Sequence, residues 1–148
     1  MLAVIQRVSR ASVSIENKVV GKINQGFLIL LGVIQGDTDQ DLEFLVNKTA
    51  NLRIMADENK KMNLNLKDAK GEILVISQFT LAANLKKGNR PSFINAAEGK
   101  TAEKYYLQFI DKLKNKNLSV ATGKFGAYMK VKLTNDGPTT IIIDSKDK

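Results

Sequence analysis

The chain has 148 residues, about the length of one domain, and 43% of them are apolar, so it can bury a core without a metal or a disulfide. It has no cysteine and no histidine, which excludes disulfides, thiol nucleophiles, imidazole zinc sites and every catalytic dyad or triad that uses histidine. The net charge is +8, and residues 75–148 supply nearly all of it, with 13 basic against 6 acidic side chains. We predict a single domain over residues 1–148, whose second half either binds a polyanion or carries a solvated lysine-rich surface.

Short alternating segments at the start of the chain predict strands over residues 3–9, 11–15 and 19–23. Residues 27–34 form an apolar run without a polar face, which is typical of a central strand covered on both sides. This longest apolar run has eight residues, whereas a membrane-spanning helix needs about 20. We therefore predict no membrane segment, no signal peptide and a cytoplasmic location.

A helix is predicted to begin at Thr38, a good N-cap residue, and to continue to about residue 52 with Leu42 and Leu45 on its buried face. A polar turn at residues 57–61 and an apolar strand over residues 73–79 follow. Four acidic side chains surround the start of the helix, and they suit the helix dipole better than a divalent-cation site: Asp37, Asp39, Asp41 and Glu43. We predict no metal and no cofactor.

Residues 84–99 contain glycine and proline and are predicted to form an extended loop with a short helical piece. A helix follows over residues 101–116, and its spacing places Tyr106 and Phe109 in the core rather than on a platform for stacking bases. Strands are then predicted over residues 128–134 and 139–144, with a turn between them.

The order of these elements favours an α+β fold, with a largely antiparallel, curled and barrel-like sheet and two main helices. Two helices cannot cover both faces of so many strands. We therefore expect either a sheet that curls on itself or a dimer that covers the exposed face.

Two segments carry polar patterns that stand out from the elements around them. In Ser77-Gln78-Phe79-Thr80-Leu81, hydroxyl and amide groups directly follow a fully apolar strand, and buried polar groups need partners. In Asn135-Asp136-Gly137-Pro138, proline removes the backbone donor that would follow an ordinary turn. The first segment predicts a functional site at a strand end, while the second is also compatible with a tight turn and nothing more.

Together the two segments closely resemble the paired signature of the D-aminoacyl-tRNA deacylases. The resemblance runs along almost the whole chain and includes Ala3-Val4-Ile5-Gln6-Arg7-Val8, Lys87-Gly88-Asn89-Arg90-Pro91-Ser92-Phe93 and Ala121-Thr122-Gly123-Lys124-Phe125-Gly126-Ala127. Leu2 and Tyr128 depart from residues that are commonly basic and acidic, respectively, in that family. Both lie outside the signature segments, so they bear on peripheral contacts.

The resemblance implies an enzyme with the fold of that family, which hydrolyses the ester between a D-amino acid and the terminal adenosine of tRNA, and which also removes glycine mischarged on tRNA. It implies a homodimer with its sites at the subunit interface. There Gly137 and Pro138 of one chain enter the partner's pocket as a Gly-cisPro chiral filter that rejects L-aminoacyl-tRNA. It further implies that Arg7 supports this motif and that Phe125 and Met129 line an adenine pocket.

The mechanism is constrained by the absence of any side chain whose ordinary pKa lies near 7. The resemblance implies that Ser77, Gln78, Phe79 and Thr80 form the catalytic segment, with backbone N–H groups around Phe79 and Thr80 as oxyanion donors. We predict catalysis assisted by the 2′-hydroxyl of the substrate. Covalent catalysis by Thr80 is the less favoured alternative, because it requires a lysine or a carboxylate to activate the hydroxyl.

Lys86, Lys87 and Arg90 are predicted to contact tRNA phosphates, although a solvated loop explains them equally well. Two other functions stay open. A non-catalytic basic RNA-binding module accounts for the charge but leaves the polar strand end without a purpose. A serine/lysine amidohydrolase built on Ser77 needs a desolvated lysine near that serine, and the apolar residues before it supply none.

Overall fold

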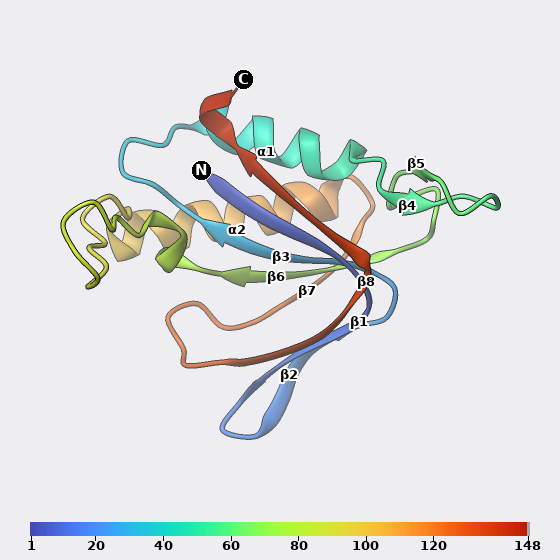
Figure 1. Cartoon of the computed structure of the whole chain (residues 1–148), viewed down its shortest axis with the longest axis horizontal. Coiled ribbons are helices and arrows are strands. Elements are labelled where there is room, and N and C mark those ends of the chain that lie inside the picture. Colours follow the sequence, from blue (N-terminus) through green and yellow to red (C-terminus); the bar gives the residue numbers. More distant parts are fainter. Residues whose placement is uncertain (148) are drawn as a thin grey trace.

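A computed structural model describes residues 1–147 of the chain (Figure 1). Its central element is β1 (Leu2–Ile15), one long curved strand where two strands were predicted. The first half of β1 pairs with β3 (Gly26–Gly32) and the second half with β2 (Lys18–Ile23), while its other edge pairs with β8 (Lys130–Asp144). All three pairings are antiparallel, so a single strand organises most of the sheet.

The last two predicted strands are also one strand, β8 (Figure 1). Both halves of β8 pair with β1, and the register shifts between them, where Val8 faces Asn135. The predicted turn at residues 135–138 is therefore wrong. The segment is an irregularity within one strand, because pairing with β1 resumes on its far side, and the Gly137–Pro138 peptide bond inside it is cis.

The sheet is mixed, with β6 (Glu72–Ser77) parallel to β3 and β7 (Ser119–Thr122) parallel to β6. Parallel neighbours need crossover connections, which contain α1 (Asp39–Asn51) and α2 (Gly99–Asn115). The short strand β7 was not predicted. The expected α+β fold with a curled sheet and two main helices is confirmed.

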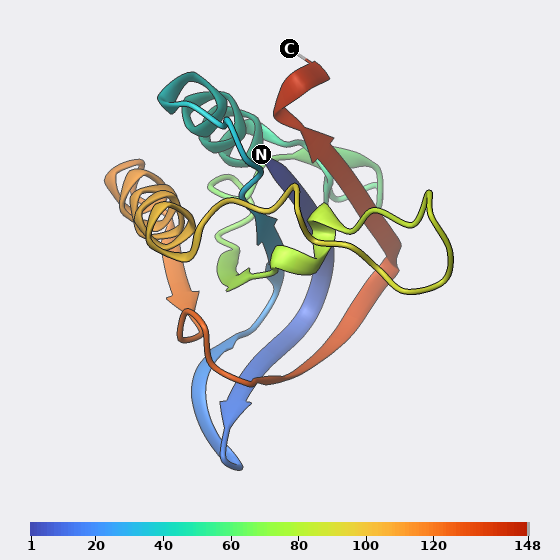
Figure 2. The same ribbon diagram turned by 90° about the vertical axis from the view of Figure 1, so that its left-hand side faces the viewer.

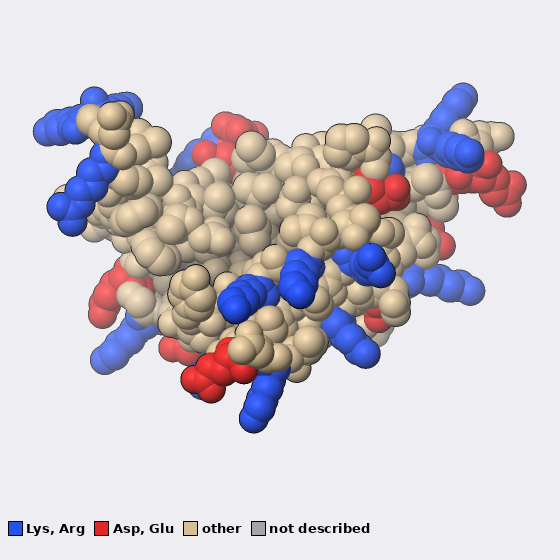
Figure 3. All heavy atoms as spheres, turned by 60° about the horizontal axis from the view of Figure 1, so that its bottom comes forward, with Lys and Arg blue, Asp and Glu red and all other residues tan. Residues whose placement is uncertain are grey.

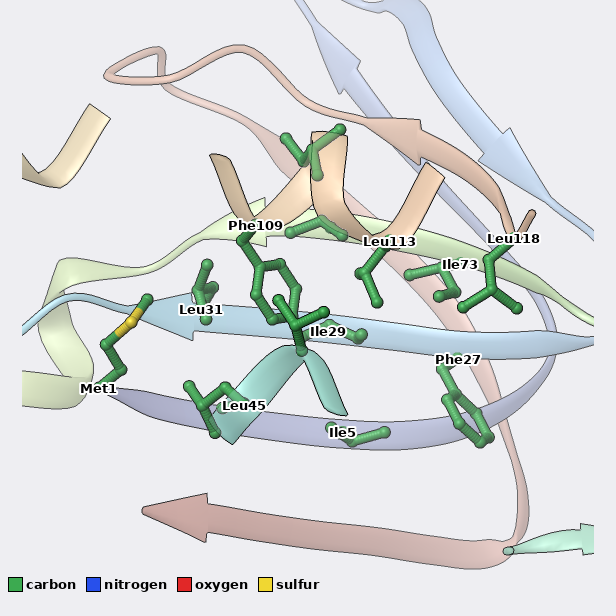
Figure 4. Packing of buried hydrophobic residues seen from close by; sticks show 14 of the residues in the cluster. Met1, Ile5, Phe27, Ile29, Leu31, Leu45, Ile73, Phe109, Leu113 and Leu118 are labelled. Carbon is green, nitrogen blue, oxygen red and sulfur yellow. The ribbon is translucent and has the colours of Figure 1, made fainter. Parts of the chain in front are cut away.

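Both helices pack on the same face of the sheet (Figure 2). Thr38 is the N-cap of α1 as predicted, and its N–H donates to Asp41 Oδ2 at 2.8 Å as part of a capping box. Helix α2 begins at Gly99, two residues before the predicted start. The core between the helices and the sheet includes side chains shown in Figure 4, among them Phe109 of α2, Leu45 of α1 and Ile29 of β3.

A second, smaller apolar cluster fills the concave side of the curled sheet, with Val13, Leu28 and Leu74 at its centre. Gly21 allows β2 to approach β7 there, because a Cβ at this position would lie 2.5 Å from the Thr122 carbonyl oxygen. The sheet therefore curls until its ends almost meet, which buries by curvature the face that two helices leave uncovered.

The remaining elements are short. The hairpin of β4 (Met55–Ala56) and β5 (Met62–Leu64) encloses the predicted polar turn. The 3₁₀ turns η1 (Phe79–Ala82) and η2 (Ser145–Asp147) follow β6 and β8. No helix in residues 1–147 is long and apolar enough to cross a bilayer, and in the same part of the chain no group of three or more Asp, Glu, His or Cys side chains could hold a metal ion.

Candidate active site

Strand β6 ends at a cavity of about 410 Å³. The cavity lies between the end of β6, the N-terminal turn of α2 and the segment that connects β7 to β8. Its walls include Ser77, Gln78 and Phe79 on one side and residues 125–129 on another. Every side chain that lines it within the described residues is uncharged, so the cavity offers apolar contacts and neutral hydrogen-bonding groups.

The predicted catalytic segment turns sharply where the sheet ends. The Gln78 N–H donates to the Leu31 carbonyl at 2.8 Å, as the last link to the sheet, and η1 begins at the next residue. The first amides of a helical turn have no acceptor within that turn, so η1 itself provides none for the N–H groups of Phe79 and Thr80. The chain makes this sharp turn because β6 ends at Ser77 and the 3₁₀ turn η1 begins at Phe79.

The side chains of this segment divide between the cavity and the solvent. Ser77, Gln78 and Phe79 line the cavity, whereas Thr80 is exposed outside its lining. The Gln78 side-chain amide donates to the Thr80 hydroxyl. Phe79 is 57% exposed and meets Phe93 edge to face, with ring centroids 5.0 Å apart.

Phe125 and Met129, the predicted adenine contacts, both line the cavity. The Phe125 ring lies 5.8 Å from that of Tyr106, whose hydroxyl donates to the Val75 carbonyl at 3.1 Å. Burial raises the pKa of Tyr106 to about 12, so this hydroxyl stays protonated. Gly123 makes room for Met129, since a Cβ there would lie 2.5 Å from the methionine sulfur.

Gly137 and Pro138 lie elsewhere, on β8, and do not line this cavity. Arg7 contacts the segment as the resemblance implies, because its Nε donates to the Asp136 carbonyl at 3.1 Å. Its Nη1 donates to the Ile54 carbonyl at 2.7 Å, which anchors the guanidinium outside the segment. Gly137 has a φ of +129°, and both it and Pro138 are exposed. Within one chain, therefore, the structure joins Arg7 to this motif but does not join the motif to the catalytic segment.

Lys86, Lys87 and Arg90 lie in a loop that projects from the body of the molecule (Figure 2). Asn84 and Ser92 close its base with two backbone hydrogen bonds, at 2.8 and 3.0 Å. None of the three basic side chains lines the cavity, so any contact they make with a ligand is outside it. The helical piece predicted within residues 84–99 is absent before the start of α2, and the loop is extended.

Sequence reasoning missed the small residues on the far wall, where Ala96, Ala97, Gly99 and Ala102 line the cavity at the start of α2. Their small size was the available signal, since a cluster of alanine and glycine leaves space beside a helix terminus. The serine/lysine alternative gains no support, because no lysine within residues 1–147 lines the cavity that contains Ser77.

The sequence of the chain matches a known protein family. The family model described as D-Tyr-tRNA(Tyr) deacylase matches residues 4–144. The D-aminoacyl-tRNA deacylase of Fusobacterium nucleatum is 56% identical over 147 residues, which cover 99% of this chain and 97% of that protein. The D-aminoacyl-tRNA deacylase of Aquifex aeolicus is also 56% identical over 147 residues, covering 99% of both proteins.

Two solved structures share the fold. The c-Myc DNA unwinding element binding protein has a TM-score of 0.91 at 42% identity, covering 97% of this chain and 98% of that one. A probable eukaryotic D-amino acid tRNA deacylase has a TM-score of 0.80 at 17% identity, over the same shares of the two chains. The match of the family model and the full-length relatives lead to one conclusion: this chain belongs to the D-Tyr-tRNA(Tyr) deacylase family and is an enzyme of the D-aminoacyl-tRNA deacylase class.

Proposed function

We propose that this enzyme hydrolyses D-aminoacyl-tRNA and glycyl-tRNA by substrate-assisted catalysis, and that the cavity at the end of β6 is its active site. The observation that carries the proposal is an uncharged cavity at the start of η1, whose first N–H groups, those of Phe79 and Thr80, have no acceptor within the turn. An aminoacyl ester is already reactive, so positioning and oxyanion stabilisation suffice for its hydrolysis.

The proposed reaction needs no ionisable side chain in the cavity. Water, activated by the 2′-hydroxyl of the terminal ribose, attacks the ester carbonyl carbon, and the N–H groups of Phe79 and Thr80 donate to the resulting oxyanion. The bond between the carbonyl carbon and the 3′-oxygen then breaks, and the 3′-oxygen takes a proton. The products are the free amino acid and tRNA with its 3′-hydroxyl restored. Phe125 and Met129 supply the apolar surface that holds the adenine.

Discrimination between D- and L-substrates is assigned to Gly137 and Pro138 of a second copy of the chain. Both residues are exposed on β8, and β8 also carries the exposed apolar side chains Leu133 and Ile142, the latter with 71% exposure. Because the motif lies outside the cavity of its own chain, a homodimer in which each subunit supplies it to the other accounts for both features. Backbone cannot rotate aside as a side chain does, so carbonyls of this motif would exclude an L side chain. The α-hydrogen that a D-amino acid or glycine has in the same position would fit.

The proposal is tested by incubating the protein with D-Tyr-tRNA and following loss of the ester. A turnover far above the rate of spontaneous hydrolysis supports it. Binding of tRNA without any loss of the ester would favour the non-catalytic RNA-binding module instead.

Replacing Thr80 with alanine is expected to keep most of kcat, because the proposed donor at this position is the backbone N–H, which alanine retains. Were Thr80 the nucleophile, the loss would be about 10³-fold or more. The measurement is single-turnover hydrolysis of D-Tyr-tRNA. Acid quenching followed by mass spectrometry provides the second readout, and an acyl group trapped on Thr80 would contradict the mechanism.

Replacing Lys86, Lys87 and Arg90 with alanine is expected to raise KM for D-Tyr-tRNA more than it lowers kcat, since phosphate contacts position the substrate. The dependence of kcat/KM on salt concentration should become shallower by up to about 0.9 per lost contact on a double-logarithmic plot. A control variant removes the same charge at the opposite end of the sheet, by changing Lys67, Lys70 and Lys116 to alanine. Equal effects of the two variants would exclude the loop from the tRNA interface.

A further inference from the structure

A second hollow, of about 500 Å³, adjoins the cavity. It lies between the β1–β2 turn and the segment before β8, and its lining includes Asn17, Lys124 and Lys130. The cavity and this hollow share Ala127 and Tyr128. A ligand that extends from one into the other therefore passes over Ala127 and Tyr128.

Tyr128 presents its ring to solvent. It is 88% exposed, the largest value among the exposed large apolar side chains of the described residues. The backbone on either side is held in place, because the Ala127 N–H donates to the Lys124 carbonyl at 3.2 Å and Lys130 pairs with Ser14 in the sheet. A fixed backbone with an exposed aromatic ring at the junction of two hollows is suited to stack a planar group.

The charges around the hollow favour an anion. Lys124 and Lys130 line it, with Glu16 as the single acidic side chain of its described lining. The Lys130 ammonium donates to Asn17 Oδ1 at 3.3 Å, which holds that side chain against the β1–β2 turn.

Another hollow also adjoins the cavity, sharing Ala96 and Ala97 with it, but its charged lining side chains within residues 1–147 are Asp37 and Glu98. A phosphate that leaves the cavity is therefore attracted toward Lys124 and Lys130, whereas the opposite hollow presents the acidic Glu98 and an Asp37 that is already paired with the N-terminal ammonium at 2.6 Å.

Basic side chains continue beyond the hollow. Figure 3 shows Lys and Arg side chains in a row across this side of the molecule. Ser12 of β1 pairs with Lys22 on one side and with Lys132 on the other, which places both lysines on the same face of the sheet. Arg10, which donates to Thr134 Oγ1 at 3.4 Å, extends the same surface.

We infer that the hollow beside Tyr128 binds the nucleotide that precedes the terminal adenosine of the substrate. Its base stacks on the Tyr128 ring, and the phosphate that links it to the adenosine lies between Lys124 and Lys130. The inference deepens the proposed function, since it rests on the terminal adenosine occupying the cavity. It makes Tyr128 a binding residue for the polynucleotide and leaves the reaction itself to the cavity.

The test measures by calorimetry how tightly the protein binds adenosine and the dinucleotide CpA. CpA adds a cytidine, linked through one phosphate, to the adenosine. Wild type is expected to bind CpA about tenfold more tightly than adenosine, the effect of one base stack. Tyr128→Ala should remove most of this gain, measured as the ratio of the two affinities in the same variant, whereas Tyr128→Phe should retain it. Lys124→Ala and Lys130→Ala should each reduce the gain, and Lys70→Ala, on a separate hollow, should not.

The inference is overturned if wild type binds CpA no better than adenosine, if it binds neither, or if the gain persists in Tyr128→Ala. It is also overturned if Tyr128→Ala changes the association state in sedimentation while CpA binding is retained, because the ring would then belong to a subunit interface.

Hydrolysis separates this result from the proposed function. D-Tyr esters of adenosine and of CpA are compared as substrates, and Tyr128→Ala should lower the ratio of kcat/KM for the CpA ester to kcat/KM for the adenosine ester about tenfold. Failure of wild type to cleave either ester would contradict the proposed function, while the binding comparison would still decide the role of Tyr128.

Discussion

Wild-type enzyme is expected to cleave D-Tyr-tRNA and Gly-tRNA while sparing L-Tyr-tRNA by about 10³-fold or more, which corresponds to about 4 kcal/mol of discrimination between transition states. The physical reason is exclusion. Carbonyls of Gly137 and Pro138 would meet an L side chain at the α-carbon, whereas a D side chain points away from them and glycine has none. The measurement is kcat/KM for the three esters on the same tRNA.

Exclusion also predicts broad tolerance of the size of the D side chain, because nothing in this scheme requires a fitted side-chain pocket. D-Asp-tRNA and D-Phe-tRNA should therefore be cleaved at rates within about tenfold of D-Tyr-tRNA, a range set by about 1.4 kcal/mol. Cleavage of L-Tyr-tRNA as fast as D-Tyr-tRNA would contradict both the filter and its assignment to these residues.

Gly137→Ala is expected to lower kcat/KM for D-Tyr-tRNA by about 10²-fold, the effect of a misplacement of about 1 Å at a positioning group. At a φ of +129°, a Cβ would lie 2.5 Å from Thr139 Oγ1 and 3.0 Å from Arg7 Nη2. The Thr139 side chain, the Arg7 guanidinium or the backbone must then move, which disturbs the contacts that hold the motif. Gly36→Ala is the matched control, since Gly36 has a φ of +84° and its Cβ would meet nothing within 4 Å.

The arrangement of the two subunits is tested by mixing two variants that each have strongly reduced activity. Phe125→Asp places a charge in the adenine pocket, while Gly137→Ala disturbs the filter. If each filter enters the partner's cavity, a mixed dimer has one site with an intact cavity and an intact filter, and should recover about half of the wild-type activity per dimer. If both parts acted within one chain, the mixture would show no more activity than the two variants measured separately.

Much of the local structure could be predicted from particular residues. The apolar runs at residues 27–34 and 73–79 marked the two buried strands β3 and β6, although β6 ends at Ser77. The cap at Thr38 and the inward face of α2 at Tyr106 and Phe109 were also confirmed. These features depend on interactions within a few residues, so their pattern is visible along the chain.

The site was predicted only in part. The polar residues after β6 marked the strand end that opens into the cavity, and the resemblance named Phe125 and Met129, which line it. The small residues at the start of α2 were missed, because an absence of side-chain volume leaves a weak signal in a sequence. Tyr128 was noted only as a departure, although it lies where two hollows meet.

The sequence by itself determined the number of main helices, the buried strands, the lack of histidine and cysteine chemistry, and the family signature, since all of these depend on residue types and short spacings. Only the tertiary structure decided that β1 and β8 are continuous, that β7 joins the sheet, and that the Gly137 motif lies apart from the cavity of its own chain. The physical reason is that strand pairing is non-local. Hydrogen bonds between β1 and β8, whose paired residues are more than 100 positions apart, keep β8 a single strand on both sides of residues 135–138. Without this pairing, the same residues would form a turn.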